Sequence, residues 1–267
     1  MNSAITPLIL TFNEAPNLRR TLERLTWAKE IVVVDSGSTD DTAAIAGEFT
    51  NVRIVVRHFD NHTAQWNFGL DQCKTDWVLS LDADYVLTPE LEAELRSFQP
   101  VASVAAYHVR FAYCVNGHPL RATLYPPRAA LFRKSCCRYE QDGHTQQLRV
   151  SGKTDWLRGI IHHDDRKPLS HWLWAQDRYA RLEVEKLLAT PVNELRLQDR
   201  LRRCIVIAPF LVFFYTLLAK GLILDGWPGW YYVLQRTYAE LLLSLRLLER
   251  KLANGPSGRD ADGCKPI

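Results

Sequence analysis

Apolar runs of strand composition alternate with segments of helical spacing over the first third of the chain. Ile5 to Phe12, Ile31 to Asp35 and Val52 to Val56 are rich in the large and β-branched apolar residues that favour strands. Between them, apolar residues such as Leu18 and Leu22 recur at the spacing of an amphipathic helix. This alternation predicts an α/β fold with a mostly parallel, doubly wound sheet, whose ligands bind at the carboxyl ends of the strands.

Two carboxylates follow the fourth apolar run. Trp77 to Leu81 has strand composition, and Asp82 and Asp84 come directly after it, before a helix that opens near Thr88. Carboxylate oxygens suit hard cations such as Mg²⁺ or Mn²⁺, and such a cation most often serves a phosphate-bearing substrate. Taken alone, such a pair more often belongs to the first turn of a helix or to a solvated loop.

Polar residues also close the other strands. Asn13 and Glu14 follow the first strand, and the segment from Asp35 to Asp40 follows the second. Because parallel strands end at one edge of a sheet, a single ligand can contact these residues and the acidic pair together.

Four segments resemble the signature blocks of the family-two glycosyltransferases with a GT-A fold. They occur in that family's order, at ordinary spacing: Thr11 to Glu14, Val34 to Thr42, Gln65 to Leu70 and Ser80 to Asp84. The resemblance covers residues 1–100 closely, and later segments make the chain most similar to the bacterial lipopolysaccharide-core glucosyltransferase branch. It implies a nucleotide-diphospho-sugar transferase fold.

The resemblance also implies roles for five side chains. Asp35 would recognise the uracil or ribose of a nucleotide sugar, Glu14 would lie at the nucleoside edge, and Asn67 would line the same pocket. Asp82 would face the ribose and sugar, while Asp84 would hold Mg²⁺ or Mn²⁺ on the diphosphate. Structural roles are open too: Glu14 could start a helix, Asn67 could be a helix-face amide, and the segment after Asp35 is typical of a turn and N-cap.

Length and composition are those of one catalytic domain with an appendage. The 267 residues can bury a sizeable core. We expect a GT-A domain over residues 1–168, with a nucleotide-sugar half (1–100) and an acceptor half (101–168), then a helical region (169–253) and a disordered tail (254–267). The six cysteines lack zinc-type spacing, which favours a reduced cytosolic setting, and no secretory signal is predicted at the start.

Charge is divided unevenly along the chain. Residues 1–100 contain 8 Lys and Arg against 15 Asp and Glu, whereas residues 101–267 contain 25 against 15. The basic part is expected to face an anionic acceptor or an anionic membrane surface. Nucleic acid is not expected as a partner, because the basic residues form no recognition motif.

The middle of the chain is expected to build the acceptor side. Tyr107 to Cys114 and Arg121 to Tyr125 flank an Asn-Gly pair at Asn116, which predicts a hairpin; a further strand is expected from Ala129 to Phe132.

An inverting transferase needs a base that takes the proton of the acceptor hydroxyl. Relatives in the lipopolysaccharide branch commonly carry His-Glu where this chain has His144 and Thr145. We therefore expect Asp142, and after it Glu140, to be the base, although both could be ordinary loop acids.

His163 is the second candidate metal ligand. It belongs to the run His162-His163-Asp164-Asp165, which cannot wrap one ion by itself. The resemblance implies that a late histidine completes the coordination that Asp84 begins. The alternative is a capping or loop histidine before the helix near Leu169.

The C-terminal region changes character. Arg200, Arg202 and Arg203 precede an uncharged stretch from Cys204 to Ala219, and aromatic residues follow from Trp227. The stretch is shorter than the roughly 20 apolar residues needed to span a bilayer, so we expect an interfacial segment on an anionic membrane. The alternative is a helix pair that packs on the catalytic domain.

Together these observations predict a metal-dependent inverting glycosyltransferase. It would move a sugar from a nucleotide-diphosphate donor, such as a UDP-sugar, to a membrane-associated glycan acceptor such as lipopolysaccharide core. It would act as a peripheral protein on the cytoplasmic face of a bacterial inner membrane. Two alternatives are a polyprenyl-phosphate glycosyltransferase, whose anionic acceptor has less need of a base, and a non-catalytic nucleotide-sugar-binding membrane scaffold.

Overall fold

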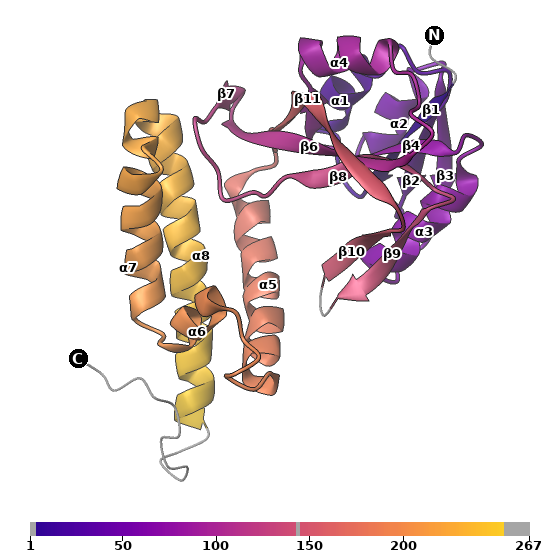
Figure 1. The fold of residues 1–267 in the computed structure, drawn as a ribbon. Coiled ribbons are helices and arrows are strands. Elements are labelled where there is room, and N and C mark those ends of the chain that lie inside the picture. Colours follow the sequence, from indigo (N-terminus) through magenta and orange to yellow (C-terminus); the bar gives the residue numbers. More distant parts are fainter. Residues whose placement is uncertain (1–3, 143–144, 254–267) are drawn as a thin grey trace. The chain divides into compact units, whose positions relative to one another are not determined.

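The chain divides into two units, Met1–Lys167 and Pro168–Ile267 (Figure 1). The computed structural model describes residues 4–142 and 145–253, and of residues 142 and 145 it describes the backbone alone. The predicted tail, residues 254–267, therefore lies outside the described residues.

The parallel strands predicted from the alternating pattern are present in the first unit. They are β1 (Ile5–Thr11), β2 (Ile31–Asp35), β3 (Val52–Val56) and β4 (Trp77–Asp82), separated by α1 (Leu18–Glu23), α2 (Thr42–Gly47) and α3 (His62–Gln72). β1 lies between β2 and β4, and β3 pairs with β2, all in parallel. Residues of β1 and β2 are almost all buried, as expected where helices cover both faces of a parallel sheet.

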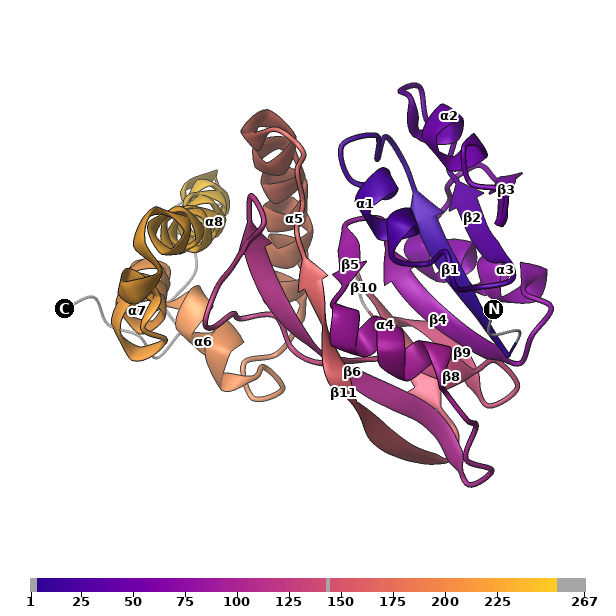
Figure 2. The ribbon, with the colours of Figure 1, turned by 90° about the horizontal axis from the view of Figure 1, so that it is seen from above.

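Beyond β4 the sheet becomes mixed. The added strands are β8 (Arg128–Arg133), β6 (Val104–Val115), β11 (Lys153–His163) and β5 (Tyr85–Leu87), with β7 (His118–Pro119) on the end of β6. β8 is antiparallel to β4 and to β6, β11 is parallel to β6, and β5 is antiparallel to β11 (Figure 2). The prediction of a mostly parallel sheet is thus right only for the first arm. After the turn at β7 the chain returns as β8, antiparallel to β6, a pairing that needs no long crossover connection.

The predicted hairpin is confirmed at its turn. Cys114 pairs with Pro119 and Val115 with His118, and the turn residues Asn116 and Gly117 both have positive φ, as a two-residue hairpin loop requires. The returning strand is shorter than expected, because only β7 pairs before the chain leaves the sheet. The strand expected from Ala129 to Phe132 is β8.

Two apolar clusters cover the two faces of the sheet. One packs β1, β4 and β6 against α1, α2 and α4 (Pro89–Arg96), and includes Leu18, Leu22 and Leu91. The other packs α3 and the separate hairpin of β9 (Cys137–Asp142) and β10 (Thr145–Val150), and includes Trp66 and Tyr139. Neighbouring residues of β1, such as Leu8 and Ile9, go to opposite clusters, because side chains alternate along a strand.

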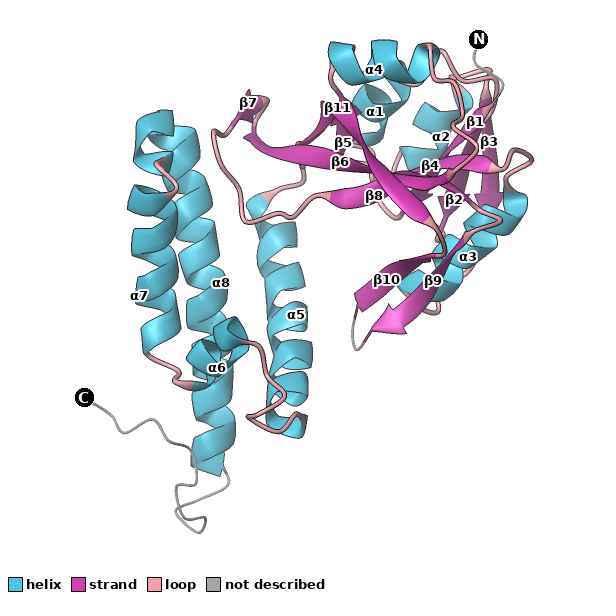
Figure 3. Ribbon diagram, viewed as in Figure 1, coloured by secondary structure: helices cyan, strands magenta, loops and turns pink. Residues whose placement is uncertain are grey.

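The second unit is helical, as expected (Figure 3). It consists of α5 (Leu169–Ala189), α6 (Leu197–Arg203), α7 (Ile207–Phe214), a π-helical turn (Tyr215–Ala219), a 3₁₀ turn (Leu222–Asp225) and α8 (Gly226–Ala253). Gly221 and Gly226 have positive φ at the reversal between α7 and α8, which favours glycine there. Leu187, Leu195 and Leu243 pack in its small core.

The length and composition of these helices bear on a membrane span. Among the described residues, no single helix is long and apolar enough to cross a bilayer. The pair Ile207–Ala219 and Leu222–Ala253, bent by 67° at its break, has sufficient length and apolar composition when its two parts are taken together.

Two of the three arginines before α7 serve the fold of the second unit. Arg202 lies 2.7 Å from Glu240 and 3.2 Å from Asp199. Arg200 donates to the backbone carbonyl of Leu195 at 2.9 Å. Arg200 and Arg202 therefore contact other residues of the second unit, and these contacts do not favour the expectation that they meet anionic lipid.

Gly159→Ala tests the packing of α4 on β11. A Cβ at this position would overlap the backbone of Leu91 and lie 2.6 Å from its amide nitrogen, so α4 would have to move. We expect a loss of about 1–3 kcal/mol in unfolding free energy, measured by urea denaturation. Gly47→Ala, where a Cβ meets nothing within 4 Å, is the matched control and should not lose stability. Equal midpoints for the two variants would contradict this packing.

Candidate active site

The loops after β1 and β2 hold each other at the carboxyl edge of the sheet. Asn13 has a φ of 53°. Its side-chain oxygen accepts a hydrogen bond from the backbone amide of Thr39 at 2.8 Å, and its backbone amide donates to Ser38 Oγ at 2.9 Å. The amide of Glu14 donates to Thr42 Oγ1 at 2.8 Å. These contacts build a fixed rim beside the acidic pair.

Asp35 organises this rim. Its buried carboxylate accepts hydrogen bonds from the hydroxyls of Thr11 and Ser38, at 2.8 and 2.6 Å, and from the amides of Gly37 and Ser38, at 3.0 and 2.8 Å. Both carboxylate oxygens are therefore engaged by the chain. A contact from Asp35 to a nucleoside stays a prediction.

Asp84 and His163 are brought together, as predicted. β11 pairs with β5 so that His163 lies opposite Tyr85, and His163 Nε2 is 3.1 Å from Asp84 Oδ2. The remaining atoms, Asp84 Oδ1 and His163 Nδ1, are buried and have no hydrogen-bond partner among the described residues. Buried polar atoms are normally satisfied, so the unpartnered oxygen of Asp84 is open to a ligand.

The residues present fit a divalent cation completed by substrate. The described residues contain no group of three His, Cys, Asp or Glu side chains that could hold a metal. Mg²⁺, however, is usually held by one or two carboxylates together with substrate phosphates and water. Asp84 Oδ2 and His163 Nε2 lie 3.1 Å apart, a separation that suits two ligands of one ion, so these two residues can supply the protein's share of such a site.

The site concentrates buried charge. Burial raises the pKa of Asp82, and the neighbouring charge of Asp84 raises it further. Burial would also raise the pKa of Asp84, but the charge and hydrogen bond of His163 outweigh it and lower that pKa. Burial would lower the pKa of His163, and Asp84 reverses this and raises it. Asp84 and His163 therefore favour each other's charged forms when no cation is bound. A cation would take the place of the proton, because a histidine binds a metal only as the neutral imidazole.

Glu14 extends the acidic cluster. Burial is the main cause that raises its pKa to about 7, Asp84 adds to the rise, and Lys167 opposes it. The carboxylate forms an ion pair with Lys167 and accepts a hydrogen bond from Asn17 Nδ2 at 2.9 Å. Glu14 thus lies near Asp84, as the strand-end argument predicts.

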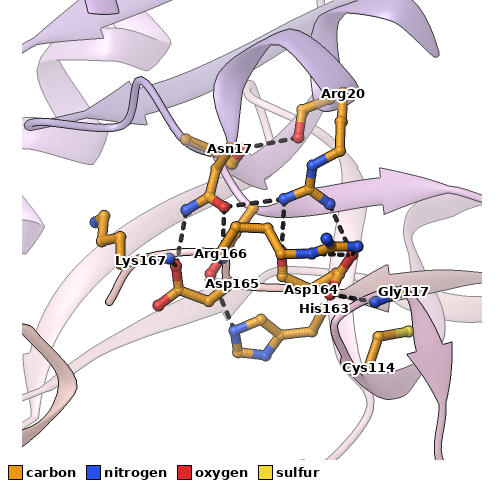
Figure 4. A network of polar contacts seen from close by, with 12 residues as sticks. Asn17, Arg20, Cys114, Gly117, His163, Asp164, Asp165, Arg166 and Lys167 are labelled. Carbon is orange, nitrogen blue, oxygen red and sulfur yellow. Dashed lines mark hydrogen bonds and ion pairs between the residues drawn. The ribbon is translucent and has the colours of Figure 1, made fainter. Parts of the chain in front are cut away.

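Asn17 connects the loop after β1 with the chain that follows β11 (Figure 4). This fully buried amide donates to Glu14 and, at 2.8 Å, to Asp165. Its oxygen accepts from Arg20 Nη2 at 2.9 Å and from the amide of Arg166 at 2.8 Å. One fully hydrogen-bonded side chain therefore joins Glu14 and Arg20 to Asp165 and Arg166, and so holds the chain after β11 beside the rim.

Asp164 forms a second connection next to Asn17 (Figure 4). Its carboxylate binds Arg20 at 2.7 Å and Arg166 at 2.8 Å, and it accepts from the amide of Gly117 at 3.1 Å. The amide of Asp164 donates to the carbonyl of Asp84 at 3.1 Å. These contacts of Asp164 also restrain the neighbouring residue, His163.

Asn67 lies outside this cluster. Its amide donates to the carbonyl of Tyr139 at 2.9 Å and accepts from the amide of Tyr139 at 3.1 Å. These two hydrogen bonds attach β9 to α3, so the side chain has a structural role here. Tyr139 in turn places its hydroxyl 2.7 Å from Ser80 Oγ, on β4. Contact between Asn67 and the donor stays a prediction.

The structure pairs Glu140 with a surface arginine and does not describe the side chain of Asp142. Glu140 alternates with Tyr139 along β9, and it binds Arg149 at 2.8 Å with 58% of its side chain exposed. The side chain of Asp142, like His144, lies outside the described residues. Asp142 therefore stays a prediction, and Glu140 has no geometric support from this structure.

Sequence reasoning missed several residues of the site. Tyr85 and Tyr125 share a hydrogen bond between their hydroxyls, and the rings of both lie about 5 Å from that of His163, at 5.2 and 5.0 Å. Arg128 lies over the Tyr125 ring, 4.5 Å from its centre. Asn17 and Arg128 carried no local motif, so only the fold reveals them.

A family comparison establishes the class of protein. The model of the family described as Glycosyl transferase family 2 matches residues 7–161, which is more than half of the chain. The chain therefore belongs to glycosyl transferase family 2. This confirms the resemblance found in the four sequence blocks.

Individual relatives narrow the comparison. The lipopolysaccharide core biosynthesis glycosyltransferase LpsC of Rhizobium meliloti is 33% identical over 100 residues, 36% of each chain. The undecaprenyl-phosphate 4-deoxy-4-formamido-L-arabinose transferase of Pseudomonas savastanoi is 38% identical over 98 residues, 31% of this chain and 28% of that protein. The chain thus spans about a third of the length of these curated relatives.

A comparison with solved structures found a partial similarity. Residues 1–349 of S. aureus TarS, in complex with UDP-GlcNAc, align with 94% of this chain and 92% of that one, at 13% identity and a TM-score of 0.47.

Asn17→Ala tests the connection across the site. It would remove partners from Glu14, Asp165 and Arg20 at a fully buried position. We expect a loss of about 1–3 kcal/mol in unfolding free energy, because buried polar groups are left unsatisfied. Asn51→Ala, which removes hydrogen bonds only to backbone carbonyls between α1 and β2, is the control for a site-independent loss. Only Asn17→Ala should also weaken UDP binding, and unchanged UDP affinity would contradict the assigned role.

Proposed function

We propose that the protein transfers a sugar, with inversion, from a UDP-sugar to a membrane-associated glycan acceptor such as lipopolysaccharide core. The observation that carries the donor half of this proposal is the buried pair of Asp84 and His163, 3.1 Å apart with Asp84 Oδ1 unpartnered, at the carboxyl edge of the parallel strands. Family membership and the similarity to LpsC support the transfer of sugar and the type of acceptor.

Asp84 and His163 would hold Mg²⁺ or Mn²⁺. When bound, such a cation supplies positive charge to the departing diphosphate. The chain keeps the two ligands in place through Asn17 and Asp164, so their geometry exists before substrate arrives. Preorganised ligands avoid reorganisation during the reaction.

The remaining residues would orient the donor. Asp82, whose pKa burial raises, would face the ribose and sugar, and Asp35, Glu14 and Asn67 stay as proposed donor contacts. Phe12 is half-exposed at the end of β1 and offers a ring on which the nucleobase can stack. Asp142, and less favourably Glu140, would take the acceptor proton.

One observation favours the polyprenyl-phosphate alternative. Glu140 binds Arg149 on the far side of β9 from Tyr139, and Thr145 stands where relatives of the lipopolysaccharide branch carry Glu. The oxygen of a phosphate acceptor is already anionic, so the reaction has less need of a general base. The partial similarity to an undecaprenyl-phosphate sugar transferase agrees with this alternative.

The second unit supports the proposed location on the cytoplasmic face of the inner membrane. Large apolar side chains are exposed along α7 and the following turns, among them Phe210, Phe214, Leu218, Leu224 and Trp227. Exposed patches of this kind are typical of surfaces that meet a partner or a lipid. Apolar burial in the interface would be the main attraction, with basic residues as a smaller contribution.

Asp84→Asn tests the donor site. Removing one ligand charge should abolish the increase in UDP affinity that Mn²⁺ provides, a loss of roughly tenfold or more, since even outer-shell partners of a metal are worth 10- to 100-fold. Isothermal titration with UDP, with and without Mn²⁺, measures it. Asp71→Asn, on the surface in an ion pair with Arg138, is the matched control. Equal Mn²⁺ dependence in wild type and Asp84→Asn would remove the metal from the proposal.

The double variant Phe210→Ser and Phe214→Ser tests the membrane surface. We expect wild type to co-sediment with vesicles that contain anionic phospholipid, and the double variant to bind about tenfold or more weakly, because burying each ring contributes roughly 1.5–3 kcal/mol. Val56→Ser, also exposed but in the first unit, is the control. Retention through alkaline carbonate would indicate a span, and absence of vesicle binding by wild type would reject the surface.

A further inference from the structure

Arg128 is a cation of the acceptor half that lies beside the acidic pair. It is the first residue of β8, whose antiparallel neighbour β4 ends at Asp82. In an antiparallel pair, one strand starts where the other ends, so Arg128 lies at the carboxyl edge of β4. Its guanidinium carbon stacks 4.5 Å from the centre of the Tyr125 ring, and the Asp82 carboxylate helps to raise the pKa of Arg128.

Arg128 is an exposed residue, and its guanidinium donors are left to solvent or to a ligand. Within residues 4–142 and 145–253, Arg128 makes its stacking contact with Tyr125 but no hydrogen bond or ion pair with a fixed partner. Arg20 and Arg166, by contrast, donate repeatedly to Asp164. A guanidinium offers five N–H donors in a rigid fork, and the ring below it fixes the plane of that fork. Arg128 is therefore prepared for a group that the chain itself does not supply.

The arrangement of the guanidinium N–H donors indicates which chemical group Arg128 can bind. Guanidinium matches the oxygens of a phosphate in a bidentate manner, which ammonium does not. In the proposed function the donor diphosphate belongs to Asp84 and His163, whereas Arg128 lies on the strand that begins the acceptor arm of the sheet. The excess of basic residues in the chain after residue 100 agrees with a second anion on this side.

We propose that Arg128 binds a phosphate group of the acceptor, and that the acceptor therefore carries a phosphate monoester near its reacting oxygen. This inference rests on the proposed function, since it assigns the second substrate of the same site. A lipid phosphate and a phosphorylated glycan share this chemistry.

A binding measurement with the donor site filled tests the proposal. The full-length protein, saturated with UDP and Mn²⁺, is titrated with farnesyl phosphate, with inorganic phosphate and with uncharged farnesol. Arg128→Ala should weaken farnesyl phosphate binding about tenfold or more, as expected for hydrogen bonds to a charged group, while UDP affinity stays within about twofold of wild type. Arg128→Lys, which keeps the charge but loses the fork, should lose less than Arg128→Ala.

Arg110→Ala is the matched control. Arg110 also stacks on an aromatic ring, 5.4 Å from the centre of Trp156, on the neighbouring strand β6. Because Val109 pairs with Arg128 and side chains alternate along β6, the Arg110 side chain leaves the opposite face of the sheet. This variant should bind all ligands like wild type.

The outcomes separate the possible ligands. A loss confined to farnesyl phosphate supports a lipid-linked phosphate, and an equal loss for inorganic phosphate supports recognition of phosphate alone. Weaker UDP binding with intact phosphate binding would overturn the proposal in favour of the donor diphosphate. Absence of phosphate binding by wild type, or unchanged binding in both Arg128 variants, would also overturn it. If UDP does not bind wild type, the proposed function fails, and titration without UDP still reports on Arg128.

Discussion

The hydrogen bonds of Asn17 are the interaction on which the site depends. This buried amide joins Glu14, after the first strand, to residues 165 and 166, after the last strand of the sheet. The neighbouring Asp164 adds ion pairs with Arg20 and Arg166. Together they hold the end of β11 against the carboxyl edge of the parallel strands. His163 reaches Asp84 because the residues on its C-terminal side are fixed in this way.

The cost of the site is electrostatic, and the surrounding cations offset it. Asp82, Asp84 and Glu14 lie close together in a poorly solvated place, where like charges disfavour ionisation. His163 pairs with Asp84, and Lys167 pairs with Glu14. Both cations come from the segment that Asn17 and Asp164 anchor. The same contacts therefore set the geometry of the site and stabilise its charge.

Local pattern predicted the parallel arm and the acidic pair, and long-range contacts decided the rest. β2 begins and ends where its run of apolar residues does, and the two acids follow β4 as expected. The antiparallel pairings of β8 with β4 and β6 were not predicted, because the choice of strand partner leaves no periodic pattern in the sequence. Asn67 has the residue type expected of a donor contact, yet its partner is the backbone of Tyr139, 72 positions away. The side on which Glu140 lies depends on the register of β9, which composition does not set.

The position of Mn²⁺ in crystals grown with UDP, located by its anomalous scattering, tests the central claim most directly. The account predicts one ion bound by Asp84 and His163 and by the diphosphate, with Asn17 and Asp164 in the contacts described above. An ion bound elsewhere, or UDP bound at this edge without any ion while Asp84 and His163 remain paired only to each other, would contradict it.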